Sequence, residues 1–515
     1  MTSVYIKVGI SSFILVLLGM ITFDITGDIF LTMAVVIAAF MAINIGANDV
    51  ANNVGPAFGA GVLTLLTALV LAAIFEAAGA LIAGGDVVKT IKKGIIDPGL
   101  INDVNVFIWI MMAALLAGGI WLAVATYKGW PVSTTHSIVG AVAGAGIAAG
   151  GFDIVSWPTL GKIAASWVIS PLMGSLISAA FLYSIKMLIV YKDDCIAEAK
   201  KVIPYMIAIM TWAIVTYLIL KGLKKIWIDI SPFIPFIEIT NKPDFITASL
   251  VALVASIFVF FFVKPRIAIK AHQVDSNKDG INKLFRIPLI ISAAALCFAH
   301  GANDVANAVG PLAAIVDSLT TGAISTKASI PVWVMILGAG GIVIGLGFFG
   351  GRIIRKVGQE ITDMSPIRAF SVAMGSTITV IIASQLGLPV SSTHIAVGGV
   401  FAIGFLKEHF DKKDQEILEQ EQMIIAEKKR VKSLSAQMEE FKATDELEQV
   451  VELQEQVIDT KKTLKGEKKD LNKMKKGRDE LKQNLKEIGL AWIITVPASA
   501  TIAGMIFFTI RGIMI

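Results

Sequence analysis

Long apolar stretches follow one another along most of the chain, separated by short polar connectors. Each can form a membrane helix or a large part of one, and they lie at 8–26, 31–45, 63–84, 104–126, 132–150, 158–190, 203–221, 244–263, 287–300, 331–350, 369–387, 390–406 and 490–514. A helix needs roughly 20 apolar residues to cross the hydrocarbon core of a bilayer. Because lipid offers no hydrogen-bond partners and barrel-type alternation is absent, the pattern predicts an all-α integral membrane protein.

A charged segment, residues 407–488, interrupts this pattern before the last apolar stretch. It holds 19 of the 45 basic and 20 of the 40 acidic residues. Two series of apolar residues recur in it at heptad spacing, one starting at Val431 and one at Val450. Between them, Thr444 or Asp445 can cap a second helix. The spacing predicts an antiparallel coiled-coil hairpin outside the membrane, and a loosely helical, solvated linker is the alternative.

Composition and charge agree with a membrane location. Hydrophobic residues make up 55% of the chain and charged residues 17%, against about 25% charged in soluble proteins. Basic residues gather in connectors such as 264–286, which the positive-inside rule assigns to the cytoplasm. No basic stripe is interleaved with aromatic residues, so a nucleic-acid partner is not expected. The first apolar stretch lacks a signal-peptide cleavage site and is expected to remain as a membrane helix.

Two motifs occur twice, in the same order and at similar spacing. Residues 46–56 read GANDVANNVGP and residues 301–311 read GANDVANAVGP, with ten of eleven positions identical. Residues 131–136 read PVSTTH and residues 389–394 read PVSSTH. The two motifs begin 85 residues apart in the first copy and 88 in the second. The apolar body therefore consists of two homologous halves.

The first motif places polar residues inside an apolar region: Asn48, Asp49, Asn52, Asn303, Asp304 and Asn307. An ionised aspartate in hydrocarbon is costly, so these residues are expected to face a cavity. Gly46 and Gly301 are expected to loosen the helix, and Gly55-Pro56 and Gly310-Pro311 to break it just after the motif. Carboxylate, amide and freed carbonyl oxygens suit a hard cation such as Na⁺. A polar hinge without a bound ion is the alternative.

The second motif favours an anion site. Pro131 suits the first turn of a helix, where its missing N–H costs nothing. The hydroxyl groups beside it lie near unpaired backbone N–H groups at the positive end of the helix dipole, an arrangement that binds phosphate or another oxyanion. These hydroxyls belong to Ser133, Thr134, Thr135, Ser391, Ser392 and Thr393. Ordinary helix capping is the alternative for a single copy.

Three further polar residues are candidates for coupling. His136 and His394 end the two PVS motifs, and histidine titrates near neutral pH, so either can relay protons. A neutral ring that donates to a backbone carbonyl is the structural alternative. Glu76 is a lone carboxylate within AAIFEAAGA and is expected to assist cation coupling. A protonated Glu76 with a structural hydrogen bond is its alternative.

The four motif copies resemble the signatures of the inorganic phosphate transporter (PiT) family. This resemblance covers nearly the whole apolar body. It implies two inverted repeats with broken or re-entrant helices, about 12 spans in all, and phosphate symport coupled to Na⁺, or to H⁺ with metal-phosphate as substrate. Some relatives carry sulfate. By the same resemblance, the Asp and Asn residues of the first motif hold the cation and the hydroxyls of the second hold phosphate. The charged segment has no counterpart in the family pattern.

These observations predict the organisation of the chain. We expect an N-terminal membrane helix (1–30), a first repeat (31–190), connecting spans with a cytoplasmic loop (191–286), a second repeat (287–406), a cytoplasmic coiled-coil hairpin (407–488) and a last membrane helix (489–515). The expected location is the plasma membrane. The hairpin is a candidate surface for a homodimer or another protein partner.

The expected activity is import of phosphate driven by a sodium gradient, with no enzyme chemistry, no cofactor and no metal beyond the coupling ion. Proton-coupled transport of phosphate or metal-phosphate and sulfate transport are the alternatives. Phosphate adds one or two negative charges to those of Asp49 and Asp304, and like charges repel strongly in a low-dielectric cavity. Two matched motifs therefore predict two Na⁺ ions per phosphate.

Overall fold

The computed structural model describes residues 2–85, 87–88, 94–101, 103–224, 226–233, 242–324, 330–356, 358, 364–411, 413–443 and 447–514. The regular secondary structure of these residues is helical, and one isolated bridge joins Ile96 and Val155. Eleven segments are long and apolar enough to cross a membrane, and Ser392–Leu406 is a shorter apolar helix. The prediction of an all-α membrane protein is confirmed.

The helices of the body occur in the same order in two sets. The first set comprises α2 (Ile29–Asn48), α3 (Ala51–Gly59), α4 (Leu65–Ala83), α6 (Val104–Lys128), α7 (Thr134–Gly150) and α8 (Trp157–Ile185). The second comprises α13 (Arg286–Asp304), α14 (Ala306–Thr321), α15 (Val332–Gly345), α17 (Pro366–Gln385), α18 (Ser392–Asp411) and α20 (Leu447–Met514). The remaining helices are α1 (Thr2–Thr26), α9 (Cys195–Tyr217), α10 (Trp227–Ile230), α11 (Phe245–Ala271), α12 (Lys278–Leu284), α16 (Gly351–Arg355) and α19 (Lys413–Ala443).

Local sequence explains where several of these helices begin. The Asp28 side chain accepts hydrogen bonds from the N–H groups of Phe30 and Leu31, and Thr64 and Asp103 cap α4 and α6 in the same way. Such caps satisfy donors that have no partner within the helix. α6 ends at Gly129, whose φ of 73° is left-handed and therefore favours glycine.

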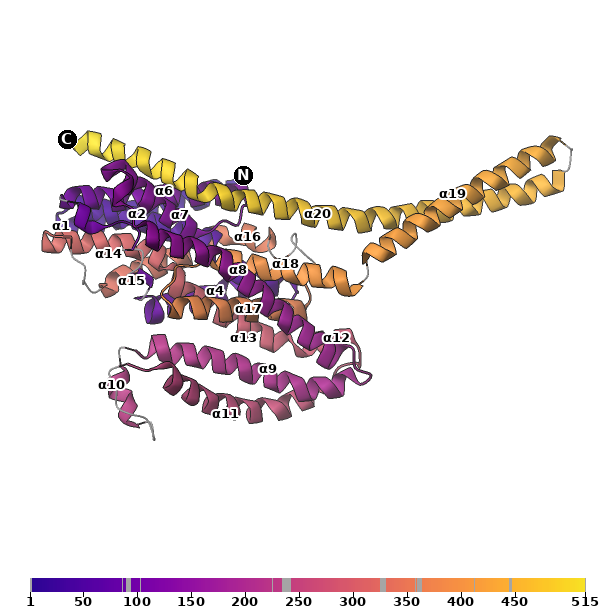
Figure 1. The fold of residues 1–515 in the computed structure, drawn as a ribbon, viewed down its shortest axis with the longest axis horizontal. Helices are drawn as coiled ribbons and strands as arrows, with labels where there is room; N and C mark the ends of the chain where they lie inside the picture. The colour runs from indigo at the N-terminus through magenta and orange to yellow at the C-terminus, as the bar shows by residue number, and fades with distance from the viewer. Residues whose placement is uncertain are drawn as a thin grey trace. The chain divides into compact units, whose positions relative to one another are not determined.

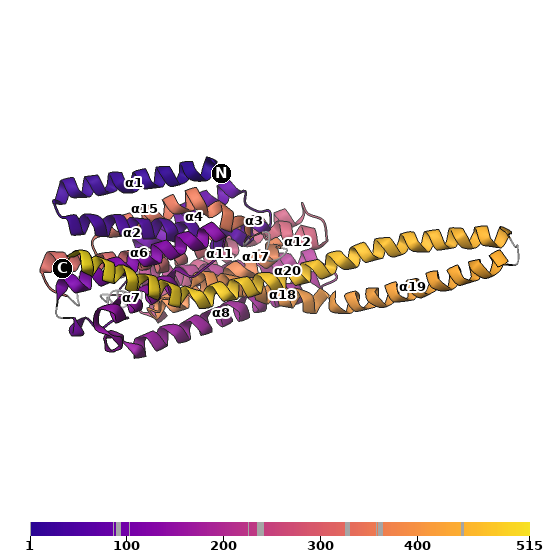
Figure 2. The same cartoon turned by 90° about the horizontal axis from the view of Figure 1, so that it is seen from above.

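The two sets run through the body in opposite directions. α1 leads from the N-terminus to the opposite end of the body, where α2 begins and turns back (Figures 1 and 2). α13 instead begins beside α12, at the same end as the N-terminus (Figures 1 and 2). α2 and α13 are the equivalent first helices of their sets, so the repeats are inverted, as predicted.

The last helix of each repeat packs against the other repeat. A Cβ atom on Gly140 or Gly144 of α7 would collide with the carbonyl groups of Val496 or Ala500 on α20. Equivalent Gly398 of α18 lies against the carbonyl of Pro171 on α8 in the same way. Small residues allow such close helix contact in membranes. The equivalence extends the second repeat beyond residue 406, so the charged segment is an insertion within that repeat.

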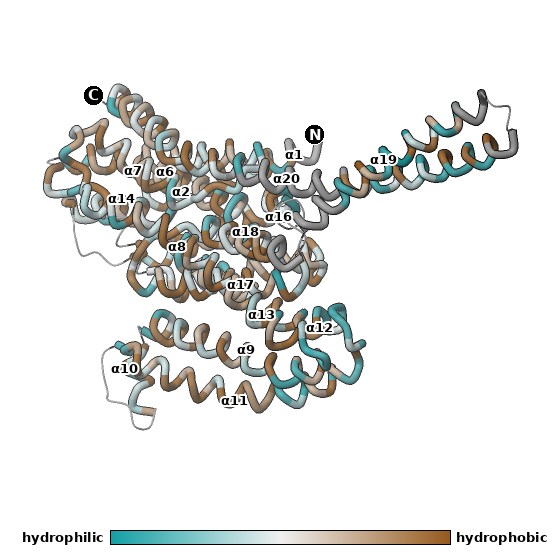
Figure 3. Tube along the Cα trace, turned by 45° about the vertical axis from the view of Figure 1, so that its right-hand side comes forward, coloured by the Kyte–Doolittle hydropathy of each residue, from teal (hydrophilic) through white to brown (hydrophobic). Residues whose placement is uncertain are grey.

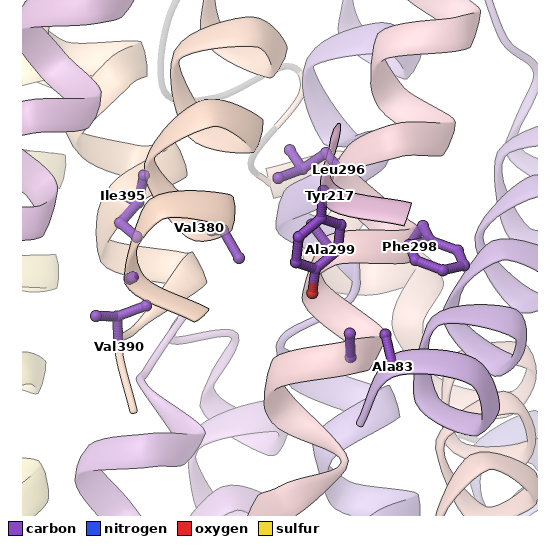
Figure 4. Close-up of a cluster of buried hydrophobic side chains, with 10 residues drawn as sticks. Ala83, Tyr217, Leu296, Phe298, Ala299, Val380, Val390 and Ile395 are labelled. Carbon is purple, nitrogen blue, oxygen red and sulfur yellow. The ribbon is translucent and has the colours of Figure 1, made fainter. Parts of the chain in front are cut away.

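A buried apolar cluster joins both repeats to α9. It includes Ala83, Leu296, Val380 and Val390, and Tyr217 of α9 packs edge-on to Phe298, with ring centroids 6.2 Å apart (Figure 4). Hydrophobic residues line the body helices, and hydrophilic residues dominate α19 (Figure 3).

Residues Gly404–Glu487 form a compact unit of their own. In this unit α19 and the first part of α20 lie side by side and antiparallel (Figures 1 and 2). Ile424 and Leu471 form a small buried cluster, and Val450 and Val457 are also buried. The predicted cap at Thr444 or Asp445 lies outside the described residues.

Candidate functional site

The GANDVAN motifs sit at breaks between consecutive helices. α2 ends at Asn48 and α3 starts at Ala51, while α13 ends at Asp304 and α14 starts at Ala306. The prediction of a break after the motif is wrong, because Pro56 and Pro311 lie inside α3 and α14. The chain instead breaks next to the aspartates themselves. At the breaks the backbone bonds tighten from four residues to three: the Asn52 N–H donates to the Asp49 carbonyl at 3.0 Å and the Ala308 N–H to the Val305 carbonyl at 3.2 Å.

The glycines before the breaks serve close packing. A Cβ atom on Gly46 would occupy the position of the Ile342 carbonyl on α15, and one on Gly301 the position of the Glu76 carbonyl on α4. These two contacts are equivalent in the two repeats. They identify Glu76 and Ile342 as equivalent positions.

The PVS motifs form the starts of α7 and α18. Ser133 is the N-cap of α7 and accepts a hydrogen bond from the His136 N–H at 3.1 Å; Ser391 accepts from the His394 N–H at the same distance. Pro131 therefore precedes the cap by two residues, and its predicted place in the first helical turn is wrong. The residues after each cap point their hydroxyls toward the GANDVAN motifs.

Each repeat forms one hydroxyl–carboxylate pair. Thr134 donates to Asp49 Oδ2 at 2.8 Å, and the equivalent Ser392 donates to Asp304 Oδ2 at 3.1 Å. Thr134 also lies within 3.4 Å of Asp304 Oδ2. All four residues are at most 1% exposed.

Amide groups connect the repeats to each other. Asn52 Nδ2 donates to Thr393 Oγ1 at 2.9 Å, and Asn307 Nδ2 donates to Thr135 Oγ1 at 3.3 Å. The second bond is the inverted-repeat counterpart of the first. Thr135 in turn donates to the carbonyl of Val390, in the second PVS motif, at 3.0 Å. The structure thus gathers all four motif copies into one buried cluster.

The two remaining asparagines differ from this pattern. Asn48 donates to Thr126 Oγ1 and to the Trp130 carbonyl, and its own oxygen accepts from the Val132 N–H at 3.1 Å. Both Nδ2 and Oδ1 of Asn48 therefore form hydrogen bonds with the backbone of the loop that leads into α7. Asn303 Nδ2 is buried and has no hydrogen-bond partner among the described residues.

His300 is a site residue that the sequence reasoning missed. Its Nδ1 is 2.6 Å from Glu76 Oε2, its Nε2 is 2.8 Å from Asp304 Oδ2 and 3.8 Å from Asp49 Oδ2. Asn53 donates to the other Glu76 oxygen at 2.9 Å. Glu76 thus reaches the cluster through an imidazole. The available signal was that histidine precedes the second GANDVAN copy where Ile45 precedes the first.

This chain of contacts makes the two repeats unequal. The equivalents of Glu76 and His300 are Ile342 and Ile45, both fully buried and apolar. The His300 ring thus lies between the carboxylates of Glu76 and Asp304, and the Asp49 carboxylate lies 3.8 Å from its Nε2.

Several buried acceptors in the cluster have no donor among the described residues. They include Asp304 Oδ1 and Asn52 Oδ1. Buried polar atoms are nearly always paired, so orphan oxygens of this kind mark a place for a ligand. Ligand atoms of Asp49, His300 and Asp304 all lie within 4.8 Å of one another. Oxygens around a net negative charge suit a hard cation.

His136 and His394 do not contact this cluster through hydrogen bonds of their side chains in the described structure. The two rings meet edge to face, with centroids 4.3 Å apart. Both ring nitrogens of His136 and Nε2 of His394 are buried and have no hydrogen-bond partner among the described residues. Tryptophan rings cover their outer sides. The predicted alternative of a ring donating to a carbonyl is not seen for either Nε2.

Comparisons with known proteins agree with this arrangement. A sequence model described as the phosphate transporter family matches residues 45–503. A protein of Helicobacter pylori strain J99, designated a phosphate permease, is 48% identical over 388 residues, which cover 75% of this chain and 70% of that protein. A similarly designated Haemophilus influenzae protein is 36% identical over 72% of this chain and 86% of that protein. A solved structure described as the sodium-dependent phosphate transporter has a TM-score of 0.73 and 28% identity, covering 94% of this chain and 99% of that chain.

Proposed function

Because the chain belongs to the phosphate transporter family, we propose that it is a secondary active symporter that imports inorganic phosphate with sodium ions. The observation that carries this proposal is the pair of hydroxyl–carboxylate contacts at two opposed helix breaks, joined by amides across the repeats. Broken helices at the interface of inverted repeats are typical of secondary transporters, where they bind ions and substrate.

Sodium fits the cluster by charge and by ligand type. The orphan oxygens of Asp304 and Asn52 are hard ligands, and the carboxylates of Asp49 and Asp304 add negative charge. One Na⁺ ion for each aspartate offsets that charge, after which the anion enters without strong repulsion. The candidate cation ligands are Asp49, Asn52, Asp304 and Asn307.

Phosphate fits the starts of α7 and α18. Thr134, Thr135, Ser392 and Thr393 lie within the first helical turns, where free backbone N–H groups and the helix dipole favour an oxyanion. The dipole of one helix offsets only about half a charge. A dianion therefore needs both helices, and the inverted repeats bring them together.

Uptake of labelled phosphate into proteoliposomes tests the proposal. An inward Na⁺ gradient should drive saturable accumulation, and sulfate in tenfold excess should compete poorly. Accumulation that follows a pH gradient at zero Na⁺ would favour the proton-coupled alternative. Effective competition by sulfate would favour a sulfate permease, and flux that does not saturate would favour a channel.

A further inference from the structure

Two tryptophans form a crossed pair of contacts with the PVS motifs. Trp167 of α8 packs on the His136 ring of its own repeat, with ring centroids 3.7 Å apart. Its indole N–H donates to the carbonyl of Pro389, in the PVS motif of the other repeat, at 3.3 Å. The Trp167 side chain therefore contacts the PVS motifs of both repeats.

Trp492 of α20 makes the equivalent contacts with the two repeats exchanged. Its ring stacks on His394 at 3.8 Å, and its indole N–H donates to the Pro131 carbonyl at 3.2 Å. Trp167 and Trp492 are equivalent, because Pro171 and Val496 four residues later make the equivalent glycine contacts. With His136 and His394 in contact, the four rings form one continuous row.

The two tryptophan indoles donate to the carbonyls of Pro131 and Pro389, and the position of these carbonyls explains the role of the hydrogen bonds. Each proline lies two residues before an N-cap, outside the helix, so its carbonyl has no helical partner. Buried carbonyls of this kind need a donor. The indole N–H supplies it and fixes the loop backbone that leads into the first turn. The free backbone N–H groups of that turn are the donors assigned to phosphate.

We propose that Trp167 and Trp492 are positioning residues for phosphate, each fixing the substrate motif of the opposite repeat. This inference rests on the proposed function. Both motifs have to approach one anion from opposite sides, so their separation has to be set to a fraction of an ångström. The crossed contacts set it, because neither loop shifts without breaking a hydrogen bond and a ring contact to the other repeat. We call this arrangement the tryptophan clasp.

Replacing the indole by a phenyl ring removes the hydrogen bond but keeps an aromatic ring, so the two contributions can be measured separately. Trp167→Phe and Trp492→Phe keep an aromatic ring on each histidine and remove the N–H. Loss of one buried hydrogen bond should weaken phosphate binding about three- to tenfold. The half-saturating Na⁺ concentration should stay within twofold of wild type, since neither tryptophan contacts Asp49 or Asp304. Trp212→Phe is the matched control: Trp212 lies on α9 and donates to Ser249 on α11 at 3.0 Å.

The primary measurement is the binding of labelled phosphate to the purified protein at saturating Na⁺. The same measurement is repeated at low pH without Na⁺, the condition that suits the proton-coupled alternative. An affinity loss in Trp167→Phe and Trp492→Phe but not in Trp212→Phe supports the clasp. Unchanged affinity in both, or an equal loss in the control, overturns it. A parallel rise in the half-saturating Na⁺ concentration also overturns it, because that result indicates a general distortion. If one variant does not fold, the other alone decides.

This design keeps the clasp separate from the mode of coupling. Failure of wild-type protein to accumulate phosphate in a Na⁺ gradient contradicts sodium symport, while the binding comparison still tests the tryptophans. Conversely, normal sodium-driven uptake with unchanged phosphate affinity in both variants contradicts only the clasp.

Discussion

At the scale of single residues, the two aspartates carry the charge that recruits the cations. Asp49→Asn and Asp304→Asn each remove one negative charge from a buried cluster, so Na⁺ should no longer bind at that position. We expect sodium-driven phosphate uptake to fall to background in both variants. The measurement is uptake in proteoliposomes against Na⁺ concentration. Wild-type Na⁺ dependence in Asp304→Asn would leave one cation site and reduce the second motif to a hinge.

Glu76 acts on the cluster through His300 and has no counterpart in the other repeat. Glu76→Gln keeps the size of the side chain but removes the carboxylate 2.6 Å from His300 Nδ1. His300 then loses the carboxylate that holds its ring beside Asp304. We expect phosphate uptake to fall about tenfold or more, since a hydrogen bond to a charged group contributes roughly 1.5–3 kcal/mol.

A suitable control for Glu76→Gln is Asn44→Ala on α2. Asn44 is also a buried polar residue, but its amide donates only within its own helix, to Phe40. Its replacement should leave uptake within about twofold, as expected for an isolated hydrogen bond. Equal losses in the two variants would show that Glu76 has a structural role without influence on Asp304.

The sequence could predict the motif residues of the cluster because each motif occurred twice. Duplication turned Asp49 and Asp304 from isolated polar residues into a matched pair. The same reasoning missed His300, since its equivalent is Ile45 and the Glu76–His300 contact links positions 224 residues apart. Composition also does not reveal that the amide of Asn48, predicted as a cation ligand, bonds the Trp130 carbonyl and the Val132 N–H.

At the scale of helices, the breaks depend on glycine at crossings where backbones touch. Gly345 of α15 lies against the Ile43 carbonyl of α2, so a methyl group there has to displace backbone. Gly345→Ala should lower the stability of the folded protein by about 1–3 kcal/mol. Gly340→Ala is a control on the same helix, because no atom lies within 4 Å of its added Cβ. Thermal unfolding in detergent compares them, and equal melting temperatures would contradict the close-packing argument.

The sequence predicted the helix breaks but put them at the wrong residue. Proline normally disrupts a helix interior, and Gly55-Pro56 was therefore taken as the break. In the structure, Pro56 is the sixth residue of α3, a nine-residue helix, so the helix continues through the proline. Apolar content located the spans well, because length and hydropathy alone decide whether a helix crosses a membrane.

At the scale of the whole molecule, the inserted hairpin contains none of the four motifs. We predict that it is cytoplasmic and dispensable for transport, because unit Gly404–Glu487 is compact by itself. Replacing residues 412–484 with a short flexible linker should leave the half-saturating phosphate concentration within about twofold. Uptake assays with equal amounts of reconstituted protein measure this. A large rise in that concentration would show that the hairpin participates in substrate binding.

The exchange of last helices between repeats has a consequence for biosynthesis. During translation α7 is made early, but its Gly140 and Gly144 pack against α20, which is made more than 300 residues later. The first repeat therefore completes its packing only after the second repeat and the charged hairpin have been made. A nascent chain that stops before α20 leaves the glycine face of α7 without its packing partner.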